Sequence, residues 1–405
     1  MRCGVVLFDS ANNISVGDKT FASLDSGWAS VGGESAVRIT SVHDLDSAVL
    51  WVTNLTEEQF YRAGLSGHAN FRNEGYFRSS LRHLYTELGV DPQFVSPATV
   101  ATVLSTVAHR VVEEAQRQYK VAPRSKSLND DFAYALNAPR SAIAADMYQL
   151  FEGSAQHAYV RTVQTNTYLN QGAALTLRRN RLTHARELLS LPVPPDTQWE
   201  YIPREKLPSS QAAIESMLSE CNTAFLVRCN AKNINPLVAD VFSVGSGAKA
   251  IREWLTDIEW QQAREWADIE YNSVLLCHSA SAPIPQAEAL PTDPYASLSV
   301  TCGLLAEQVW TAMTMKRGGR GESARYTAAA AWFRAMDRSV MFSYAQKLHA
   351  KGLTVWGYGN GNVVVLYPEG GLRHALDVST DMGLLAPASK LLEASRGTTG
   401  EVHAA

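Results

Sequence analysis

The sequence predicts an α+β fold that is predominantly helical, with long helices and short strands or hairpins, an arrangement that suits a plate-like subunit. Three observations indicate this. Apolar residues recur at helical spacing in several long segments, short apolar runs near the N-terminus alternate with turn residues, and Gly359-Asn360-Gly361 separates two apolar runs as in a β-hairpin. The 405 residues, 46% hydrophobic and 19% charged, have an ordinary globular composition.

The first 55 residues are predicted to form a strand-rich segment. Residues 4–8 and 48–53 are short apolar runs between Gly, Asn, Asp and Ser residues, a pattern typical of strands joined by turns. The run at 4–8 is too short for the core of a signal peptide and lacks a cleavage pattern. No stretch of the sequence approaches the roughly 20 apolar residues that a membrane-spanning helix needs.

Residues 56–191 are predicted to form a helical lobe. Helices are expected from Thr56 onward and over residues 75–88, 97–119, 129–151 and 172–190, with Pro139 interrupting the fourth. The clearest of them follows Ser96-Pro97, which supply a cap and a first-turn proline. The run Pro192-Val193-Pro194-Pro195 ends this lobe and is the expected hinge.

Residues 196–395 are predicted to form an α+β lobe, and 396–405 a flexible tail. Strands are expected at 224–229 and 273–277, and the hairpin at 353–358 and 362–367. Helices are expected over residues 214–221, over 296–315, from about 333 to 351, and around Ile251, Trp254, Leu255 and Ile258.

Charge and cysteine content limit the functional classes. Thirty-six Lys and Arg residues against 40 Asp and Glu give a net charge of −4, so no global basic field drives tight phosphate binding. The five cysteines are odd in number and scattered, which favours free thiols in a reducing compartment such as the cytoplasm.

No segment carries a clear catalytic, cofactor or metal signature. Gly245-Ser246-Gly247-Ala248-Lys249 lacks the glycine spacing and the Lys-Ser/Thr pair of a phosphate loop, so a plain helix start is favoured. Cys277-His278-Ser279 ends an apolar strand, but adjacent strand residues point to opposite faces and do not easily share a proton. His43-Asp44-Leu45-Asp46 is interpreted as an exposed turn rather than a metal site.

Two basic clusters are candidates for nucleic-acid contact, through phosphate binding by Lys and Arg. They consist of Arg178, Arg179 and Arg181, and of Lys316, Arg317 and Arg320. A solvated helix face or a subunit contact explains both equally well. Aromatic residues near charges, such as Trp254, Trp260 and Trp266, fit either a stacking platform for single strands or a core.

Two segments of the C-terminal third carry a family resemblance. One is Asp293-Pro294-Tyr295-Ala296-Ser297-Leu298-Ser299-Val300, leading into a helix that ends at Met315-Lys316-Arg317. The other runs from Ala331-Trp332-Phe333 through Leu348 and Gly352 to Val355-Trp356-Gly357-Tyr358-Gly359. Both resemble capsid proteins of totivirus-like double-stranded RNA viruses, and the helix over 100–119 with the preceding Leu81-Arg82-His83-Leu84-Tyr85 is similar too. Those proteins are usually longer, and no residue here matches the cap-transferring histidine that some of them carry.

The resemblance implies a structural, self-assembling coat protein that encloses an RNA genome in a virion or in the host cytoplasm. Its expected partners are copies of itself, with an icosahedral shell as one arrangement, and genomic nucleic acid held by weak contacts, with no membrane, no cofactor and no enzymatic activity. Two alternatives stay open: a viral single-stranded nucleic-acid-binding protein or polymerase cofactor, and an enzyme whose site is assembled from distant residues. Nine tryptophans and fifteen tyrosines are a large supply for a chain with no ligand pocket visible in its sequence, which favours assembly because such rings are enriched where protein surfaces meet.

Overall fold

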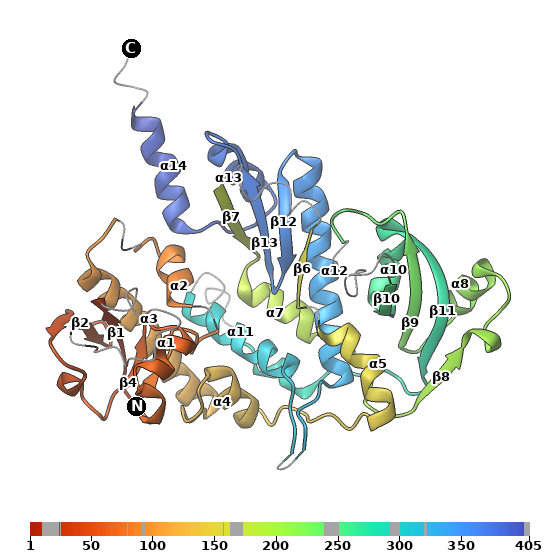
Figure 1. Cartoon of the computed structure of the whole chain (residues 1–405), viewed down its shortest axis with the longest axis horizontal. Helices are drawn as coiled ribbons and strands as arrows, with labels where there is room; N and C mark the ends of the chain where they lie inside the picture. Colours follow the sequence, from red (N-terminus) through yellow and green to blue (C-terminus); the bar gives the residue numbers. More distant parts are fainter. Residues whose placement is uncertain are drawn as a thin grey trace. The chain divides into compact units, whose positions relative to one another are not determined.

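The computed structural model describes residues 1–9, 24, 26–78, 80–90, 92, 94–156, 158–162, 173–238, 251–291, 300–319 and 322–400. The chain divides into two compact units, whose elements are labelled in Figure 1. Unit 1 comprises Met1–Ala138, Ala289–Ala312 and Ala386–Ala405, and unit 2 comprises Pro139–Glu288 and Met313–Leu385. The boundary predicted at residue 55 therefore falls inside unit 1, and the hinge predicted at 192–195 falls inside unit 2. No described helix is long and apolar enough to cross a membrane.

Unit 1 is built on a five-stranded sheet in the order β3-β2-β1-β4-β5. Its strands are β1 (Cys3–Phe8), β2 (Gly27–Val31), β3 (Val37–Ile39), β4 (Leu50–Thr53) and β5 (Phe71–Arg72). All six residues of β1 are buried, as expected for a central strand covered on both faces. β1 pairs antiparallel with β2 and parallel with β4, so both strands predicted in this segment are confirmed.

The described helices of unit 1 are α1 (Glu57–Arg62), α2 (Leu81–Glu87), α3 (Pro97–Tyr119), α4 (Leu128–Ala135), α11 (Val300–Thr314) and α14 (Ala388–Gly400). The last two residues of α11 are assigned to unit 2. Each of α1 to α4 begins directly after a Ser or Thr whose side chain accepts a backbone N–H of the first turn. The hydroxyl of Ser96 accepts the Thr99 N–H at the start of α3, which packs against β1 and β2. The predicted helix over 75–88 is shorter than expected, because Arg78 has a positive φ and Ser80 caps a new start at Leu81.

Unit 2 contains two four-stranded sheets around one long helix. The first sheet has the order β10-β9-β11-β8, with β8 (Trp199–Pro203), β9 (Phe225–Lys232), β10 (Ile251–Thr256) and β11 (Asp268–Cys277). The second has the order β6-β12-β13-β7, with β6 (Tyr159–Arg161), β7 (Ala173–Arg178), β12 (Thr354–Gly359) and β13 (Asn362–Tyr367). The helices are α5 (Ala145–Gln156), α7 (Arg181–Leu189), α8 (Gln211–Ser219), α10 (Asp257–Trp266), α12 (Ala328–Ala350) and α13 (Leu372–Asp381).

Helix α12 organises unit 2, because it packs against β12, β10, α5, α7 and α10. The predicted hairpin is confirmed as β12 and β13, which pair with Gly359 opposite Asn362. The two residues between them, Asn360 and Gly361, both have positive φ angles, of 52° and 71°. Such a two-residue turn needs the Asn-Gly pair that the sequence supplies here.

Three sequence predictions are corrected by the structure. The first half of the predicted helix over 172–190 is strand β7, because its residues pair with the length of β13. Ile251, Trp254 and Leu255 lie on strand β10, and only Ile258 of that predicted helix lies in α10. The predicted tail is helical as far as Gly400. The interruption predicted at Pro139 is confirmed, because the segment 129–151 is divided between α4 and α5.

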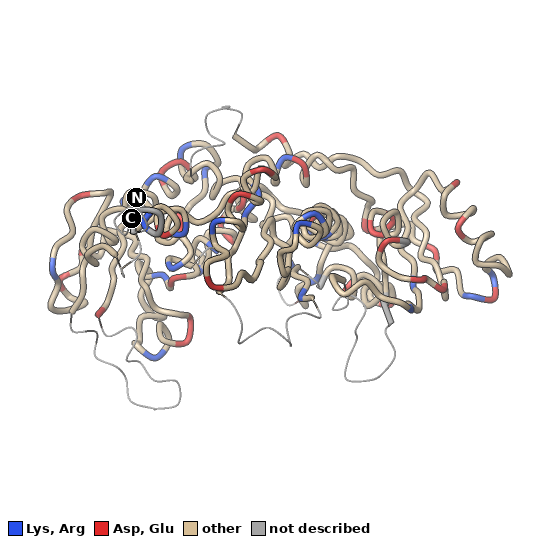
Figure 2. The backbone as a smooth tube through the Cα atoms, turned by 90° about the horizontal axis from the view of Figure 1, so that it is seen from above, with Lys and Arg blue, Asp and Glu red and all other residues tan. Residues whose placement is uncertain are grey.

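The fold is thus α+β, but with three sheets it is more evenly mixed than the predominantly helical fold that the sequence predicts. The plate-like shell shape stays a prediction. Figure 2 shows Lys and Arg interspersed with Asp and Glu along the chain, in agreement with the small net charge.

Candidate nucleic-acid interface

The first predicted basic cluster lies within the packed part of unit 2. The Arg178 N–H donates to the Leu385 carbonyl at 2.8 Å, in a bridge beyond the end of β7. The Arg179 guanidinium forms an ion pair with Glu187 and lies 5.9 Å from the ring centroid of Tyr344. Arg181 is buried in the first turn of α7. These arginines hold elements of unit 2 together, and only a small part of their surface faces solvent.

A buried carboxylate next to this cluster fixes the turn of the hairpin. Asp337 on α12 accepts the N–H groups of Asn360 and Gly361 at 2.6 and 2.9 Å. Its Oδ1 also lies 2.8 Å from Nε2 of His184, and both side chains are almost fully buried. Two backbone donors and an imidazole satisfy this carboxylate, so the group has a structural role.

A second buried ion pair lies beside it on the same helix. Arg338 Nε is 2.7 Å from Glu259 Oε1, with side chains only 1% and 0% exposed. Glu259 also accepts the N–H of Thr256 and so completes the capping box of α10. Asp257, in the first turn of α10, has its pKa raised to about 6, mainly by burial and also by the neighbouring charge of Glu259.

The second predicted cluster belongs to a partly exposed group that we call the tyrosine–cation array. It consists of Tyr148, Lys316, Arg325, Tyr326 and Arg334. Lys316 Nζ and Arg334 Cζ lie 4.8 and 4.7 Å from the ring centroid of Tyr326. Arg325 Cζ lies 5.2 Å from the ring centroid of Tyr148. Cations and aromatic rings therefore alternate across α5, α12 and the segment between α11 and α12.

Backbone bonds hold the array in place. Arg317 and Arg325 exchange both of their backbone hydrogen bonds, at 2.9 and 3.2 Å, which closes the connecting segment into an antiparallel bridge. Arg334 donates from Nη2 to the Thr314 carbonyl at 3.1 Å, and from Nη1 to the Ala155 carbonyl. The rings and guanidinium groups are thus oriented before any ligand arrives, which lowers the entropic cost of binding.

The array has a positive balance of charge. Together with the neighbouring Arg317, the array has four cationic side chains. Two carboxylates lie beside them: Glu152, which pairs with Lys316, and Glu322, which accepts the Gly319 N–H. Lys316 is exposed, and its hydrogen bond to Glu152 raises its pKa, so the ammonium group stays charged at neutral pH. Burial raises the pKa of the Tyr148 hydroxyl, so this ring stays neutral. Exposed cations can bind phosphates, and neutral rings beside them can stack on bases.

Sequence reasoning identified Lys316 and Arg317 but missed Tyr148, Arg325, Tyr326 and Arg334. Of the missed residues, Arg325 and Tyr326 follow the second basic cluster closely in the sequence. This nearness was the signal that could have indicated them. Arg320 and the segment Gly245-Ser246-Gly247-Ala248-Lys249 lie outside the described residues.

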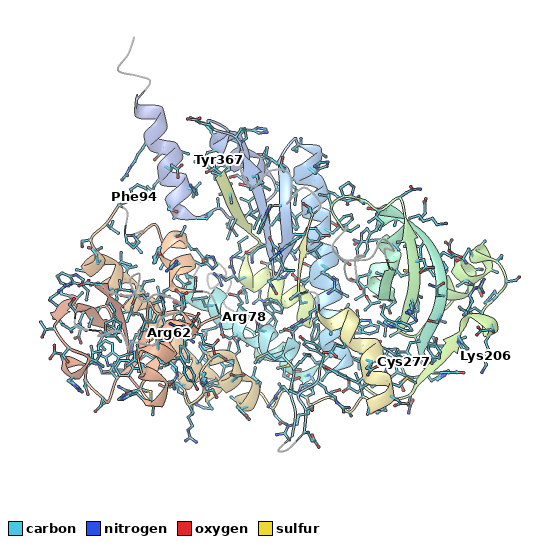
Figure 3. All side chains as sticks on the ribbon, viewed as in Figure 1. Arg62, Arg78, Phe94, Lys206, Cys277 and Tyr367 are labelled. Atoms are coloured by element: carbon cyan, nitrogen blue, oxygen red, sulfur yellow. The ribbon has the colours of Figure 1, made fainter. Side chains whose placement is uncertain are left out.

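The remaining candidate sites have the structure of ordinary strand ends and turns. Cys277, labelled in Figure 3, is fully buried, and burial raises the pKa of its thiol. The adjacent His278 is exposed and bonds Glu200 at 2.8 Å, whereas the Ser279 hydroxyl donates to Gln198. The Cys277 thiol is therefore buried whereas the His278 imidazole is exposed, as the alternation of side chains along a strand predicts.

The segment around His43 is an exposed turn. Asp44 ends the short 3₁₀ helix Val42–Asp44 and accepts the N–H groups of Thr40 and Ser41, which lower its pKa. Among the described residues there is no group of three or more His, Cys, Asp or Glu side chains arranged to hold a metal ion. The expectation that the chain is not an enzyme stays a prediction.

Comparisons with known proteins give no family assignment. No family model and no curated protein matches this sequence. Among solved structures, the chain is similar to Phi29 DNA polymerase complexed with primer-template DNA, in a post-translocation binary complex, with a TM-score of 0.48, 9% identity, and coverage of 90% of this chain and 80% of that chain. The same polymerase complexed with single-stranded DNA gives a TM-score of 0.46 and 10% identity, covering 84% and 76% of the two chains. Similarity at this level assigns neither a family nor a function to the chain.

Proposed function

We propose that this protein binds single-stranded nucleic acid through the tyrosine–cation array of unit 2. The observation that carries the proposal is the alternation of three cations with the rings of Tyr148 and Tyr326. A single strand offers bases to the rings and phosphates to the cations, and stacking on one aromatic side chain contributes about 1–3 kcal/mol per base. The Lys316 side chain pairs with Glu152 but is still 37% exposed, so a phosphate can approach it from solvent.

The charge of the whole chain sets the expected strength of binding. A protein with a net charge of −4 lacks a broad basic surface, so attraction depends on the few cations of the array. We therefore expect modest affinity at low salt that falls steeply as salt is added. Sequence preference is expected to be weak, because every base has a face that can stack.

The experiment is a salt series of fluorescence anisotropy with labelled single-stranded DNA and RNA oligonucleotides. The wild type is expected to bind at low salt, and Lys316→Gln to bind more weakly, with a slope of log K against log salt that is smaller by about one. Lys390→Gln is the matched control, because Lys390 on α14 forms a similar exposed pair with Glu393. Absence of binding at low salt, or equal losses in both variants, contradicts the proposal.

A self-assembling coat protein is our second proposal. The observation that favours it is the pair Leu391 and Leu392 on α14, whose side chains are 49% and 48% exposed. Adjacent exposed leucines are uncommon on a surface that meets only water. Sedimentation velocity tests this idea: large particles support it, and a monomer at micromolar concentration contradicts it.

A further inference from the structure

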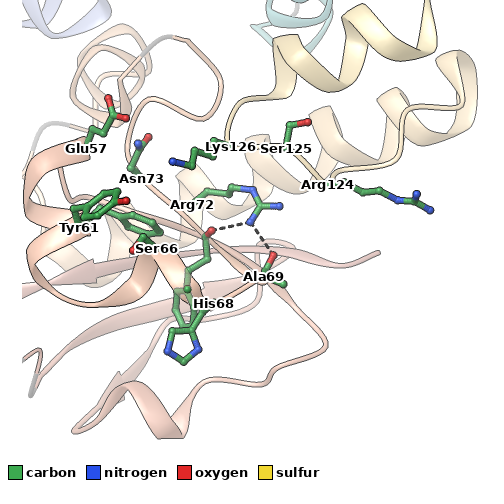
Figure 4. Close-up of a pocket in the computed structure, with 13 residues that line it drawn as sticks. Glu57, Tyr61, Ser66, His68, Ala69, Arg72, Asn73, Arg124, Ser125 and Lys126 are labelled. Carbon is green, nitrogen blue, oxygen red and sulfur yellow. Dashed lines mark hydrogen bonds between the residues drawn. The ribbon is translucent and has the colours of Figure 1, made fainter. Parts of the chain in front are cut away.

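A pocket of about 180 Å³ lies in unit 1, outside the array (Figure 4). Helix α1, the short helix η3 (Leu65–Gly67), β5 and the loop before α4 surround it. Its walls combine apolar rings, polar groups and cations, and its lining residues are Glu57, Phe60, Tyr61, Ser66, Gly67, His68, Ala69, Phe71, Arg72, Asn73, Arg124, Ser125 and Lys126.

One wall joins an exposed ring to an exposed cation. Tyr61 is 62% exposed, and Lys126 Nζ lies 5.7 Å from its ring centroid. Figure 4 shows Lys126 directed toward Tyr61 and Asn73, whereas the guanidinium group of Arg124 points the other way. A flat ligand lying on Tyr61 would thus place a negatively charged substituent close to the Lys126 ammonium group.

The base of the pocket holds a buried arginine. Arg72 is only 6% exposed, and its Nη1 donates to the carbonyls of Ala69 and Phe71 at 2.8 and 2.7 Å. Its buried Nε has no hydrogen-bond acceptor in the part of the chain that the structure describes. A buried donor without an acceptor is costly, so an acceptor supplied by a ligand would be favourable there.

Hydrogen bonds to a buried carboxylate fix the loop that carries Lys126. The carboxylate of Asp131 on α4 accepts the N–H groups of Arg124 at 3.2 Å and of Ser125 at 2.9 Å. Asp131 is itself buried, so these hydrogen bonds are shielded from water. The pocket is therefore largely formed in advance, as is usual for small-molecule sites.

Charge and size restrict the class of ligand. Arg72 and Lys126 outnumber the one lining carboxylate, Glu57, which favours an anion. Phe60 and Phe71 are buried in the walls and favour a flat apolar part. A volume of about 180 Å³ is below the roughly 300–1,000 Å³ of pockets that enclose drug-sized ligands, so the pocket encloses only part of a nucleotide-sized ligand and the rest lies in solvent.

We propose that this pocket binds one nucleotide unit, with its base against Tyr61 and its phosphate near Lys126 and Arg72. The site is separate from the array in residues and in unit, so it adds to the proposed strand binding without depending on it. The proposed ligand is an aromatic base bearing a phosphate. Either a free nucleotide or the end of a nucleic-acid strand can supply it.

The test is equilibrium dialysis of the full-length protein with labelled adenosine 5′-monophosphate, adenosine and inorganic phosphate. The complete nucleotide is expected to bind best, and Tyr61→Leu and Lys126→Gln each to weaken it about tenfold. Tyr134→Leu, which alters another exposed tyrosine of unit 1, and Lys390→Gln are the matched controls and are expected to bind as the wild type does. No binding of the nucleotide, or equal losses in the controls, overturns the proposal.

Two further measurements distinguish a free nucleotide from a strand end as the ligand, and the pocket from the array as its binding site. Displacement of the labelled nucleotide by a 5′-phosphorylated oligonucleotide assigns the pocket to a strand end, whereas displacement by free nucleotide alone assigns it to a free ligand. Lys316→Gln is expected to leave nucleotide binding unchanged even though it weakens strand binding. If Lys316→Gln instead abolishes nucleotide binding, the nucleotide occupies the array and the pocket proposal is wrong.

Discussion

Arg334 and Arg338 lie one turn apart on α12, yet they belong to two different regions of unit 2. Arg338 is buried with Glu259, and the Arg338 side chain is 1% exposed. Arg334 lies half-buried over the ring of Tyr326, next to the exposed Lys316. An arginine on α12 therefore stabilises the fold where it is buried with Glu259. Another arginine, one turn away, contributes to the proposed tyrosine–cation array. Burial, rather than charge, decides between these roles.

The largest expected effect is in the buried region. Arg338→Met keeps most of the side-chain volume but leaves the Glu259 carboxylate buried without its counter-ion, so we expect a loss of about 3–5 kcal/mol in the free energy of unfolding. Urea denaturation measures it. Arg117→Gln, which breaks the surface pair with Glu114, is the control and is expected to leave the free energy of unfolding nearly unchanged. Similar losses in the two variants would remove the distinction between the regions.

The pH dependence of stability sharpens the picture of the buried region. Burial raises the pKa of Asp257 from 3.8 to about 6, so the folded state binds the proton more tightly than the unfolded state. The stabilisation that Asp257 contributes is therefore fully present below about pH 4 and is lost as the pH rises to about 6. Above that pH this group causes no further change in the free energy of unfolding. The total loss is at most about 3 kcal/mol.

Asp257→Asn removes this ionisation and keeps an acceptor for the Ile258 N–H. The difference in unfolding free energy between the variant and the wild type, measured from pH 4 to pH 7, is expected to shift in favour of the variant. A difference that does not change with pH would show that Asp257 is not buried as described.

A smaller effect is expected at the turn of the hairpin. Asp337→Asn offers one acceptor oxygen where the carboxylate offers two, so one of the N–H groups of Asn360 and Gly361 loses its partner. The expected loss is about 2 kcal/mol in thermal or urea unfolding. An unchanged midpoint would indicate that solvent reaches this turn.

The smallest effect on stability is expected in the array. Lys316→Gln alters a side chain that is 37% exposed and pairs with Glu152, which is 28% exposed, so the free energy of unfolding should change by less than about 0.5 kcal/mol. Urea denaturation of the variant used for the binding series measures this. A loss as large as that of Arg338→Met would mean that Lys316 stabilises the fold, and that its binding phenotype is indirect.

The fold was predictable where a local signal determines the structure. Ser96 and Pro97 define the start of α3, and the Asn360-Gly361 turn defines the hairpin. β7 and β10 were predicted as helices because short runs such as Ala173-Ala174-Leu175-Thr176-Leu177 suit either structure, and only pairing with β13 or β9 decides. Such pairing joins residues far apart in the chain, which no local pattern records.

The candidate site was predictable only in part, for a similar reason. A run of arginines such as Arg178-Arg179-Asn180-Arg181 gives no information on burial, so this cluster and the one at Lys316 are equivalent in the sequence. The partners that separate them, Glu187 and Tyr344 for one and Tyr326 and Arg334 for the other, are brought in by α7 and α12. The pocket of unit 1 likewise joins α1 to a loop about sixty residues later, as Tyr61 and Lys126 show.

Photocrosslinking tests the central claim most directly. A single-stranded oligonucleotide carrying 5-bromouracil is bound at low salt and irradiated, and the attached peptides are identified by mass spectrometry. The account predicts crosslinks to Tyr148 or Tyr326 that disappear at high salt. Crosslinks confined to other residues, or none from an oligonucleotide shown to be bound, would contradict it.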